Sequence, residues 1–496
     1  MGYKIVLTAD RTLMSEYNSS IFLGFAACGP SFLPNWLYKL IFCPSVEHRN
    51  GVALKAPLGL RKIEASLLSN GISEDDIVVA HPDYIDEFID KDTKVLGITT
   101  NDPLGLGPAS STFGGLMGRE PYTAIFFREL VTNPMIRKYG IKVIVGGQGA
   151  WQLNDEKIMA KYNIDTICMG EGEEIVNEIF SKALNGGDLP RVVETGPVPI
   201  EKVPIVKKSV INGFVEIARG CGRGCDFCNP TMLKFRCFPL DRIVEEVKAN
   251  VLMSKNVTLH AEDVLRYKAK GMVPNEEEVV RLFESVSKIT KKIGMSHIAL
   301  ASVVAKPSLI ERISEILEIG KGNRYWVSAQ TGIETGSPEL ASEHLKGKAK
   351  PHNVKDWPNI VKESFKILNE AHWVPCATLI IGLPGEKNED IMKTIKLVEE
   401  LGEYKSFIVP LFFVPIGTLN GERFFGLKDM RPEHWKLIAT CIKHDMKWIY
   451  PLIDELFSMN NISSVKKIIM KNIVNYAYIK LAPYLESMEK GKNPFT

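Results

Sequence analysis

Three cysteines within eight residues are the part of the sequence best suited to chemistry. Cys221, Cys225 and Cys228 directly follow a strand-like run at 214–219. Thiolates are the ligands that iron–sulfur clusters take, and this spacing lets one loop bind one face of a compact cluster. Three ligands would leave one iron of a four-iron cluster without a protein ligand. That iron would be open to a small molecule.

Two other uses of these cysteines fit less well. A zinc site needs a second Cys pair or a His pair to close a tetrahedron, and Cys237 stands alone nearby. Nine scattered cysteines without a signal peptide are typical of a reducing interior rather than of disulfides. The glycines of the loop favour a cluster, because they let the backbone fold tightly around it and direct N–H groups at its sulfurs. These glycines are Gly220, Gly222 and Gly224.

The pattern Cys-x3-Cys-x2-Cys, with the aromatic Phe227 just before the last cysteine, resembles the signature of radical S-adenosylmethionine enzymes. The resemblance implies that Cys221, Cys225 and Cys228 hold a 4Fe-4S cluster whose open iron chelates S-adenosylmethionine. An electron passed through the cluster would cleave this cofactor to methionine and a 5′-deoxyadenosyl radical, which abstracts a hydrogen atom. An electron donor of the ferredoxin or flavodoxin type is implied as a partner.

The sequence around and after the cysteines alternates between strand-like and helix-like segments. Six such units fit the partial (β/α)6 barrel of the radical family, with the active site at the carboxyl ends of the strands. We place this barrel at 214–416. The predicted strands are 214–219, 257–260, 298–303, 326–331, 378–381 and 407–413, and the predicted helices are 239–254, 275–293, 307–319, 356–371 and 388–402.

Three of the strand ends carry residues that resemble cofactor-binding motifs of the family. The acidic pair Glu262-Asp263 follows the second predicted strand, where the family has a motif that binds the amino group of the cofactor. The pair shares only its acidity with that motif. The run 332–337 resembles the Gly-Ile-Glu-Ser-Gly-Ser motif near the ribose and carboxylate, and 382–386 resembles the glycine motif against the adenosine. The cofactor-binding residues that these resemblances imply are Glu262, Asp263, Gly332, Glu334, Ser337, Gly382 and Gly385, together with Phe227.

Residues 1–186 show short apolar strands alternating with helices, which predicts an α/β domain with a parallel sheet covered on both faces. The strands are expected at 3–7, 77–80, 95–99, 142–145 and 166–169, and helices at 57–68, 122–131 and 173–184. Glycines stand at two strand ends, where ligands bind in such sheets, although glycine often merely closes a turn. They are Gly146, Gly147, Gly170 and Gly172.

With the cysteine loop downstream, this first domain resembles the Rossmann-like, cobalamin-binding-type domain at the front of many radical S-adenosylmethionine enzymes. Whether cobalamin binds is left open. The Asp-x-His-x-x-Gly motif that supplies an axial histidine in many cobalamin proteins is absent, and His81-Pro82-Asp83 has the wrong order. Many radical members of this subclass also lack the motif.

The remaining segments are less specific. Residues 187–213 are rich in proline and predict a linker, and 417–496 predict a C-terminal helical domain. The aromatic segment 13–45, which includes Phe22, is either ordinary core or part of an apolar ligand wall. The C-terminal helices are either a plain cap on the barrel, the wall of a hydrophobic cavity, or a surface that rests on a membrane.

The composition limits the partners that the sequence predicts. The net charge is +2, with 61 basic and 59 acidic residues interspersed, so no basic stripe indicates a nucleic-acid partner. Without a signal peptide or a long apolar run, we expect a cytoplasmic protein, with peripheral membrane contact as an option. The other six cysteines show no ligand spacing.

The overall layout resembles archaeal radical enzymes that join or cyclise isoprenoid lipid chains. The first functional hypothesis is therefore hydrogen abstraction from unactivated carbons of a hydrophobic lipid, followed by C–C bond formation. The alternative is a cobalamin-dependent radical S-adenosylmethionine C-methyltransferase. A third reading, a cofactor-binding sensor or electron carrier, would need a closed four-cysteine cluster, which a loop with three cysteines does not provide.

Overall fold

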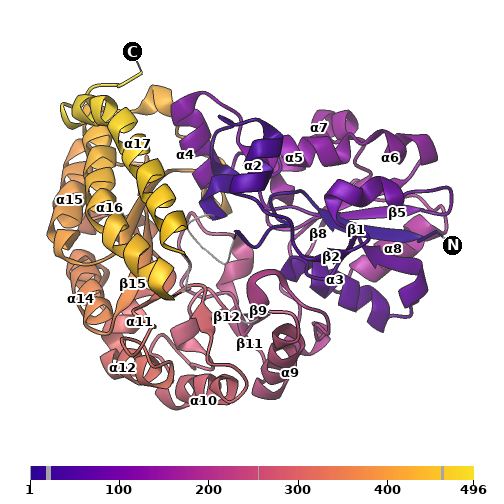
Figure 1. The fold of residues 1–496 in the computed structure, drawn as a ribbon, viewed down its shortest axis with the longest axis horizontal. Coiled ribbons are helices and arrows are strands. Elements are labelled where there is room, and N and C mark those ends of the chain that lie inside the picture. The colour runs from indigo at the N-terminus through magenta and orange to yellow at the C-terminus, as the bar shows by residue number, and fades with distance from the viewer. Residues whose placement is uncertain (1, 18–23, 255, 460–462, 496) are drawn as a thin grey trace. The chain divides into compact units, whose positions relative to one another are not determined.

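The computed structural model describes residues 2–17, 24–254, 256–459 and 463–495. Phe22 lies outside these residues. The chain folds into two compact units (Figure 1). The N-terminal unit comprises Met1–Val215 and Phe238–Thr258, and the barrel unit comprises Glu216–Cys237 and Leu259–Thr496. The division predicted from sequence into 1–186, 187–213, 214–416 and 417–496 stays a prediction.

The N-terminal unit is built on one six-stranded parallel sheet with the order β4-β1-β5-β6-β7-β8. The five strands expected from sequence are confirmed, since their continuous apolar runs suit strands that are buried on both faces. The strands are β1 (Ile5–Ala9), β4 (Ile77–Val79), β5 (Val95–Thr99), β6 (Lys142–Gly146), β7 (Thr166–Met169) and β8 (Val192–Glu194).

Strand β8 lies in the segment that the sequence predicted as a linker. It pairs with β7 through three residues, Val192, Val193 and Glu194, between prolines at 190 and 197. Three residues show too little periodicity to be recognised as a strand, so this pairing with a distant strand decides the structure. The linker therefore supplies the edge of the sheet.

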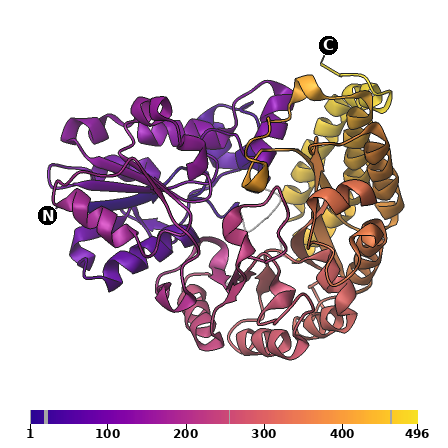
Figure 2. The same cartoon turned by 180° about the vertical axis from the view of Figure 1, so that it is seen from behind.

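Helices cover both faces of this sheet (Figure 2), and each face has its own apolar core. Helix α9 also belongs to this unit, because Glu246 on it makes a buried ion pair of 2.7 Å with Lys62 of α3. The helices are α2 (Asn35–Ile41), α3 (Leu58–Ser69), α4 (Pro108–Met117), α5 (Tyr122–Val131), α6 (Pro134–Tyr139), α7 (Glu156–Tyr162), α8 (Val176–Leu184) and α9 (Leu240–Val251). In the 13–45 segment, Tyr38 stacks on Tyr122 as core, whereas Trp36 is exposed.

The barrel unit contains a partial barrel of parallel strands. β14, β15 and β16 pair in parallel. Beyond β14, a hydrogen bond of 3.0 Å from Ile298 N to Gln330 O links the sheet to the segment that follows β13. Ser296 N donates to Leu259 O at 3.0 Å, and Ile217 N donates to His260 O at 2.9 Å. The strands are β9 (Phe214–Glu216), β12 (Val257–His260), β13 (Ile293–Met295), β14 (Val327–Glu334), β15 (Trp373–Ile381) and β16 (Phe407–Phe412), of which β9 and β12 begin in the N-terminal unit.

One predicted strand of the barrel is wrong. Residues 298–303 were expected as a strand, but the third strand is Ile293–Met295 and Leu300–Ala305 forms a helix. A short apolar run cannot be assigned to strand or helix from periodicity alone. The helices of the barrel unit are α10 (Glu276–Ser287), α11 (Leu300–Ala305), α12 (Pro307–Ile316), α13 (Pro338–His344), α14 (Trp357–Glu370), α15 (Asn388–Glu400), α16 (Pro432–Met459) and α17 (Ser464–Glu489).

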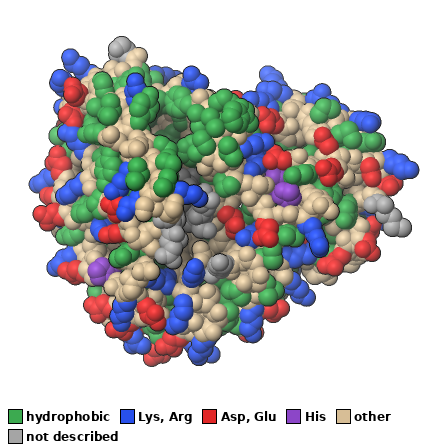
Figure 3. Space-filling model, viewed as in Figure 1, with side chains coloured by type: hydrophobic (Ala, Val, Ile, Leu, Met, Phe, Trp, Pro, Cys, Tyr) green, Lys and Arg blue, Asp and Glu red, His purple; other side chains and the backbone are tan. Residues whose placement is uncertain are grey.

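The two C-terminal helices differ in burial. Helix α16 packs against α15 and β16 and continues through Pro451. Helix α17 exposes many apolar side chains, and Figure 3 shows hydrophobic groups on this surface. They include Val465, Ile468, Ile469, Ile473, Tyr476 and Ile479. No helix among the described residues combines the length and apolarity that a membrane span needs.

Candidate active site

The cysteine loop lies between two short antiparallel strands, β10 (Ala218–Arg219) and β11 (Arg236–Cys237). Its three glycines all have left-handed backbones, with φ values of 70°, 67° and 68° at Gly220, Gly222 and Gly224. L-residues with side chains rarely adopt this region, which explains the glycines. At the first of them, a Cβ atom would lie 2.5 Å from the carbonyl oxygen of Lys234.

The three thiols are half-buried and close enough to interact electrostatically. Burial raises the pKa of Cys225 to about 11, and burial together with the neighbouring Cys221 and Cys225 raises the pKa of Cys228 to about 12. A bound cationic metal centre reverses such a shift, because it stabilises thiolates directly. The curled glycine loop and the three adjacent thiols therefore fit an iron–sulfur cluster.

Within 2–17, 24–254, 256–459 and 463–495, no group of three or more His, Cys, Asp or Glu is arranged to hold a single metal ion. Ligands of a cluster bind different iron atoms at its corners, so they need not meet at one point.

Two arginines that the sequence reading did not single out fix the cysteine loop. Arg223, inside the loop, donates to the carbonyl oxygens of Lys348 at 2.9 Å and Lys350 at 2.8 Å. Its other nitrogen, Nη2, donates to Asp263 Oδ2 at 3.1 Å. Arg266 Nη1 donates to the carbonyl oxygen of Cys221 at 2.6 Å. The loop is thus tied to distant parts of the barrel unit.

The two acidic residues after β12 take different positions. Both oxygens of Asp263 are used inside the protein, since Oδ1 accepts from Ala299 N and Oδ2 accepts from Arg223 and from Ser302 Oγ at 2.7 Å. Glu262 instead lies near Cys228 and His297, and its charge acts on the pKa of both. Of this pair, Glu262 is the one placed to meet a ligand beside the cysteines.

At the end of β14, Glu334 forms an ion pair of 2.5 Å with Lys348, and both side chains are largely buried. Lys348 also lies close enough to Cys225 and Cys221 for their charges to raise its pKa, alongside that of Glu334. A Cβ on Gly332 would lie 1.8 Å from Glu334 Oε1 and 2.6 Å from Lys348 Nζ. Glycine at this position therefore makes room for a charged pair next to the thiols.

The other residues expected to bind the cofactor have structural contacts of their own. Ser337 caps α13 and donates to Asp390 Oδ1 at 2.5 Å. Gly382 has a φ of 85°, and a Cβ there would lie 2.1 Å from the Phe425 ring, while Gly385 has a φ of 77°. Phe227 packs against the apolar cluster of Leu340, Leu383 and Phe413, which places the cysteine loop near the end of β15.

Two histidines lie close to Glu262 and Lys348. The rings of His260 and His297 have centroids 6.2 Å apart, and burial lowers the pKa of His297. On β15 and β16, Ile380 is paired with Leu411 and Thr378 with Val409. No motif in the sequence marks the histidines or Lys348, because isolated polar residues are more often solvated or structural.

Two of the four strand-end glycines of the N-terminal unit, Gly147 and Gly170, permit close backbone approach. A Cβ on Gly170 would lie 2.1 Å from the carbonyl oxygen of Thr195, and one on Gly147 would lie 2.5 Å from that of Thr100. A Cβ on Gly146 or Gly172 would meet only contacts of 3.6 and 3.3 Å. These glycines shape the carboxyl edge of the sheet.

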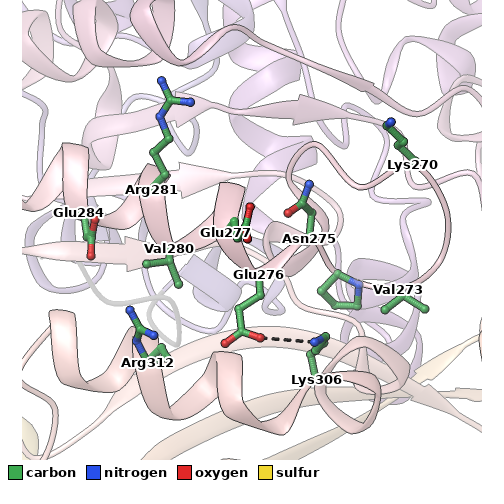
Figure 4. Close-up of a pocket in the computed structure, with 11 residues that line it drawn as sticks. Lys270, Val273, Asn275, Glu276, Glu277, Val280, Arg281, Glu284, Lys306 and Arg312 are labelled. Atoms are coloured by element: carbon green, nitrogen blue, oxygen red, sulfur yellow. Dashed lines mark hydrogen bonds and ion pairs between the residues drawn. The ribbon is translucent and has the colours of Figure 1, made fainter.

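A separate open pocket of about 780 Å³ lies beside the first turn of α10 (Figure 4). Glu276 and Lys306 form an ion pair of 3.4 Å there. Its lining within the described chain contains none of the predicted site residues, and we assign it no role.

The arginine in the cysteine loop gives a first prediction. Arg223→Gln removes the charge that pairs with the buried Asp263 carboxylate and several bonds to the 347–350 segment. Leaving a buried charge unpaired is strongly destabilising, by about 3 kcal/mol. We expect a lower thermal unfolding midpoint and reduced iron uptake during anaerobic reconstitution. Arg281→Gln, at a mostly exposed arginine of α10, serves as the control, and equal behaviour of the two variants would refute the anchoring role.

Comparison with known proteins agrees with this geometry. Residues 215–398 match the model of the Radical SAM superfamily. A tRNA-2-methylthio-N(6)-dimethylallyladenosine synthase of Clostridium novyi is 26% identical over 57% of this chain and 59% of its own length. A probable threonylcarbamoyladenosine tRNA methylthiotransferase of Methanothermobacter thermautotrophicus is 26% identical over 40% of this chain and 45% of its own. The chain thus spans less than two thirds of these relatives.

Solved structures extend the likeness beyond the barrel. The radical S-adenosylmethionine methyltransferase TsrM of Kitasatospora setae, with cobalamin and an iron–sulfur cluster bound, has a TM-score of 0.55 at 13% identity, over 84% of this chain and 74% of its own. The same enzyme with tryptophan substrate and a SAM analogue bound has a TM-score of 0.54 at 14% sequence identity. This match covers 82% of this chain and 72% of the other. At such identities the likeness shows the fold. Residues 215–398 of this chain are thus similar to the radical S-adenosylmethionine superfamily, and the fold over most of the chain resembles that of TsrM.

Proposed function

We propose that this protein is a cobalamin-dependent radical S-adenosylmethionine methyltransferase. The observation that carries the proposal is the presence, in one chain, of a three-cysteine loop on a partial barrel and a parallel-sheet unit of the cobalamin-binding type. The named relatives and structural neighbours transfer methylthio or methyl groups, so the comparisons give no support to the lipid C–C bond formation predicted first from sequence.

The residues of the site have separate roles in binding the cluster and S-adenosylmethionine. Cys221, Cys225 and Cys228 hold the cluster, and an external reductant is needed to supply its electron. S-adenosylmethionine bound there supplies a methyl group or, after reductive cleavage, a 5′-deoxyadenosyl radical. Lys348, which is paired with Glu334, supplies a positive charge beside the thiols, and Glu262 is the anion placed for an amino group.

The lining of the barrel also bears on the substrate. Buried charged and imidazole groups lose hydration, and a pure hydrocarbon chain could not replace it. Glu262, His297 and Lys348 would therefore be poorly matched to an alkyl chain, whereas the apolar cluster of Leu340, Leu383 and Phe413 beside Phe227 suits a flat or aliphatic part. We propose a substrate with both apolar surface and hydrogen-bonding groups.

Retention of the corrinoid is the test of this function. Anaerobically purified protein should be loaded with hydroxocobalamin, desalted, and examined by visible absorption. The proposal expects close to one retained corrinoid per chain, and methyl transfer from S-adenosylmethionine that depends on it. Protein that retains iron but no corrinoid would refute the methyltransferase and leave a radical enzyme with a ligand-free front domain.

A further inference from the structure

Helix α17 carries an exposed apolar stripe on the side that faces away from α16 (Figures 1 and 3). At about 100° per residue, six exposed apolar side chains fall within an arc of roughly 140° around the helix axis. They are Val465, Ile468, Ile469, Ile473, Tyr476 and Ile479, and each is between 48% and 66% exposed. The half-buried Met470, Val474 and Leu481 lie on the opposite side of the helix. Two opposite faces of α17 are therefore apolar, and the described chain covers one of them.

Positive charge accompanies this stripe. Residues 464–485 contain four lysines and no acidic residue. Lys467 and Lys471 turn toward α16, where they pair with Asp454 at 2.8 and 2.7 Å. Lys466 and Lys480 have no ion pair within the residues that the structure describes, and the Lys480 ammonium lies 5.5 Å from the centre of the Tyr476 ring. By helical geometry both lysines fall at one edge of the stripe, so this surface is apolar and cationic at once.

The charge distinguishes between the partners that could cover such a surface. A second copy of α17 would bring lysines against lysines, with no carboxylate in residues 464–485 to pair with them, and like charges oppose association. An anionic lipid surface supplies the complementary charge and takes apolar side chains into its headgroup boundary. Tyr476 also suits that boundary, because its ring is apolar and its hydroxyl is polar. The chemistry of this face therefore favours lipid over a second copy.

We propose that α17 binds the surface of a membrane that contains anionic lipid, with the helix axis parallel to the plane of the bilayer. The apolar stripe enters the headgroup boundary, and Lys466 and Lys480 pair with lipid phosphates. The contact involves none of the residues that hold the cluster or S-adenosylmethionine, so this inference does not rest on the proposed function.

The test is co-sedimentation of the whole chain with lipid vesicles. One set of vesicles consists of equal parts of phosphatidylcholine and phosphatidylglycerol, and the other of phosphatidylcholine alone. We expect about 20-fold tighter binding to the anionic set, because two unpaired lysines near a charged surface contribute about fivefold each. Raising the salt concentration should narrow this difference, since exposed charges are screened.

Two double variants separate the apolar contribution from the charged one. Ile469→Gln with Tyr476→Gln should weaken binding to the anionic vesicles by at least about tenfold, because two apolar side chains no longer enter the boundary. Lys466→Gln with Lys480→Gln should weaken it by about 20-fold. All four positions are exposed and glutamine is a good helix former, so the unfolding midpoint should stay unchanged.

Met392→Gln with Lys396→Gln is the matched control, because it replaces an exposed methionine and an exposed lysine of α15. We expect its vesicle binding to equal that of the wild type. Equal binding of the wild type to both vesicle sets, or unchanged binding by either double variant of α17, would overturn the proposal.

A second copy as the partner would give a different result. A dimer in lipid-free solution that Ile469→Gln with Tyr476→Gln abolishes, together with no vesicle binding by the wild type, would overturn the membrane contact in favour of self-association. Corrinoid retention and methyl transfer are measured without vesicles, so the proposed function is tested independently of this inference.

Discussion

Replacing Cys221, Cys225 and Cys228 with Ala should abolish iron uptake and 5′-deoxyadenosine formation together. The three thiols share one glycine-rich loop and act on one another electrostatically. Without thiolate ligands the cluster cannot assemble, and without it S-adenosylmethionine is not reduced. Iron and sulfide content and deoxyadenosine yield after anaerobic reconstitution provide the measurement.

Cys237→Ala is the matched control for this experiment. Its sulfur accepts a hydrogen bond from Lys268 N at 3.2 Å, and it lies on β11 just beyond the loop. We expect this variant to retain wild-type iron and activity. Undiminished deoxyadenosine in the triple variant would show that the cluster is held elsewhere.

Lys348→Met should have the second-largest effect. It leaves Glu334, whose side chain is 8% exposed, as an unpaired carboxylate next to the cysteines. We expect the free energy of unfolding to fall by about 3 kcal/mol, because a largely buried charge loses its partner. Removing a cation near two thiolates should also lower the midpoint potential of the cluster and weaken binding of S-adenosylmethionine. Thermal unfolding, a redox titration and ligand binding measure these effects.

The same segment provides the control. Lys346 pairs with Asp226 but its side chain is 54% exposed, and exposed pairs contribute little. Lys346→Met should change stability by less than about 1 kcal/mol and leave the cluster potential unchanged. Lys348→Arg should restore much of the potential, because it keeps the charge. If Lys348→Met and Lys346→Met behaved alike, the special role of Lys348 would be disproved.

The cysteine loop was predictable because its chemistry is local. Ligand type, spacing and glycine content all lie within nine residues, from Gly220 to Cys228. The strands of the N-terminal sheet were predictable for a related reason, since each is one continuous apolar run. The same criterion gave a wrong prediction at 298–303. That run is equally apolar, but most of it forms helix α11.

The residues that hold the cysteine loop in place were not predictable, because their roles depend on contacts between distant parts of the chain. Arg223 and Lys348 are 125 positions apart; Arg223 occupies a variable position of the cysteine motif, and Lys348 belongs to no motif. Asp263 looked like a cofactor ligand by its place after a strand, but the structure shows both of its oxygens engaged under the loop. Such roles emerge only once the fold brings the partners together.

The most direct test of the account is the mass of the product formed from trideuteromethyl-labelled S-adenosylmethionine. Protein loaded with cluster and corrinoid should be incubated with a reductant and with pooled small molecules, peptides, tRNA or lipids. Methyl transfer predicts a product that gains one trideuteromethyl group in place of a hydrogen, in an amount that depends on the corrinoid. A product that instead loses two hydrogens for each new carbon–carbon bond, without label, would contradict the account.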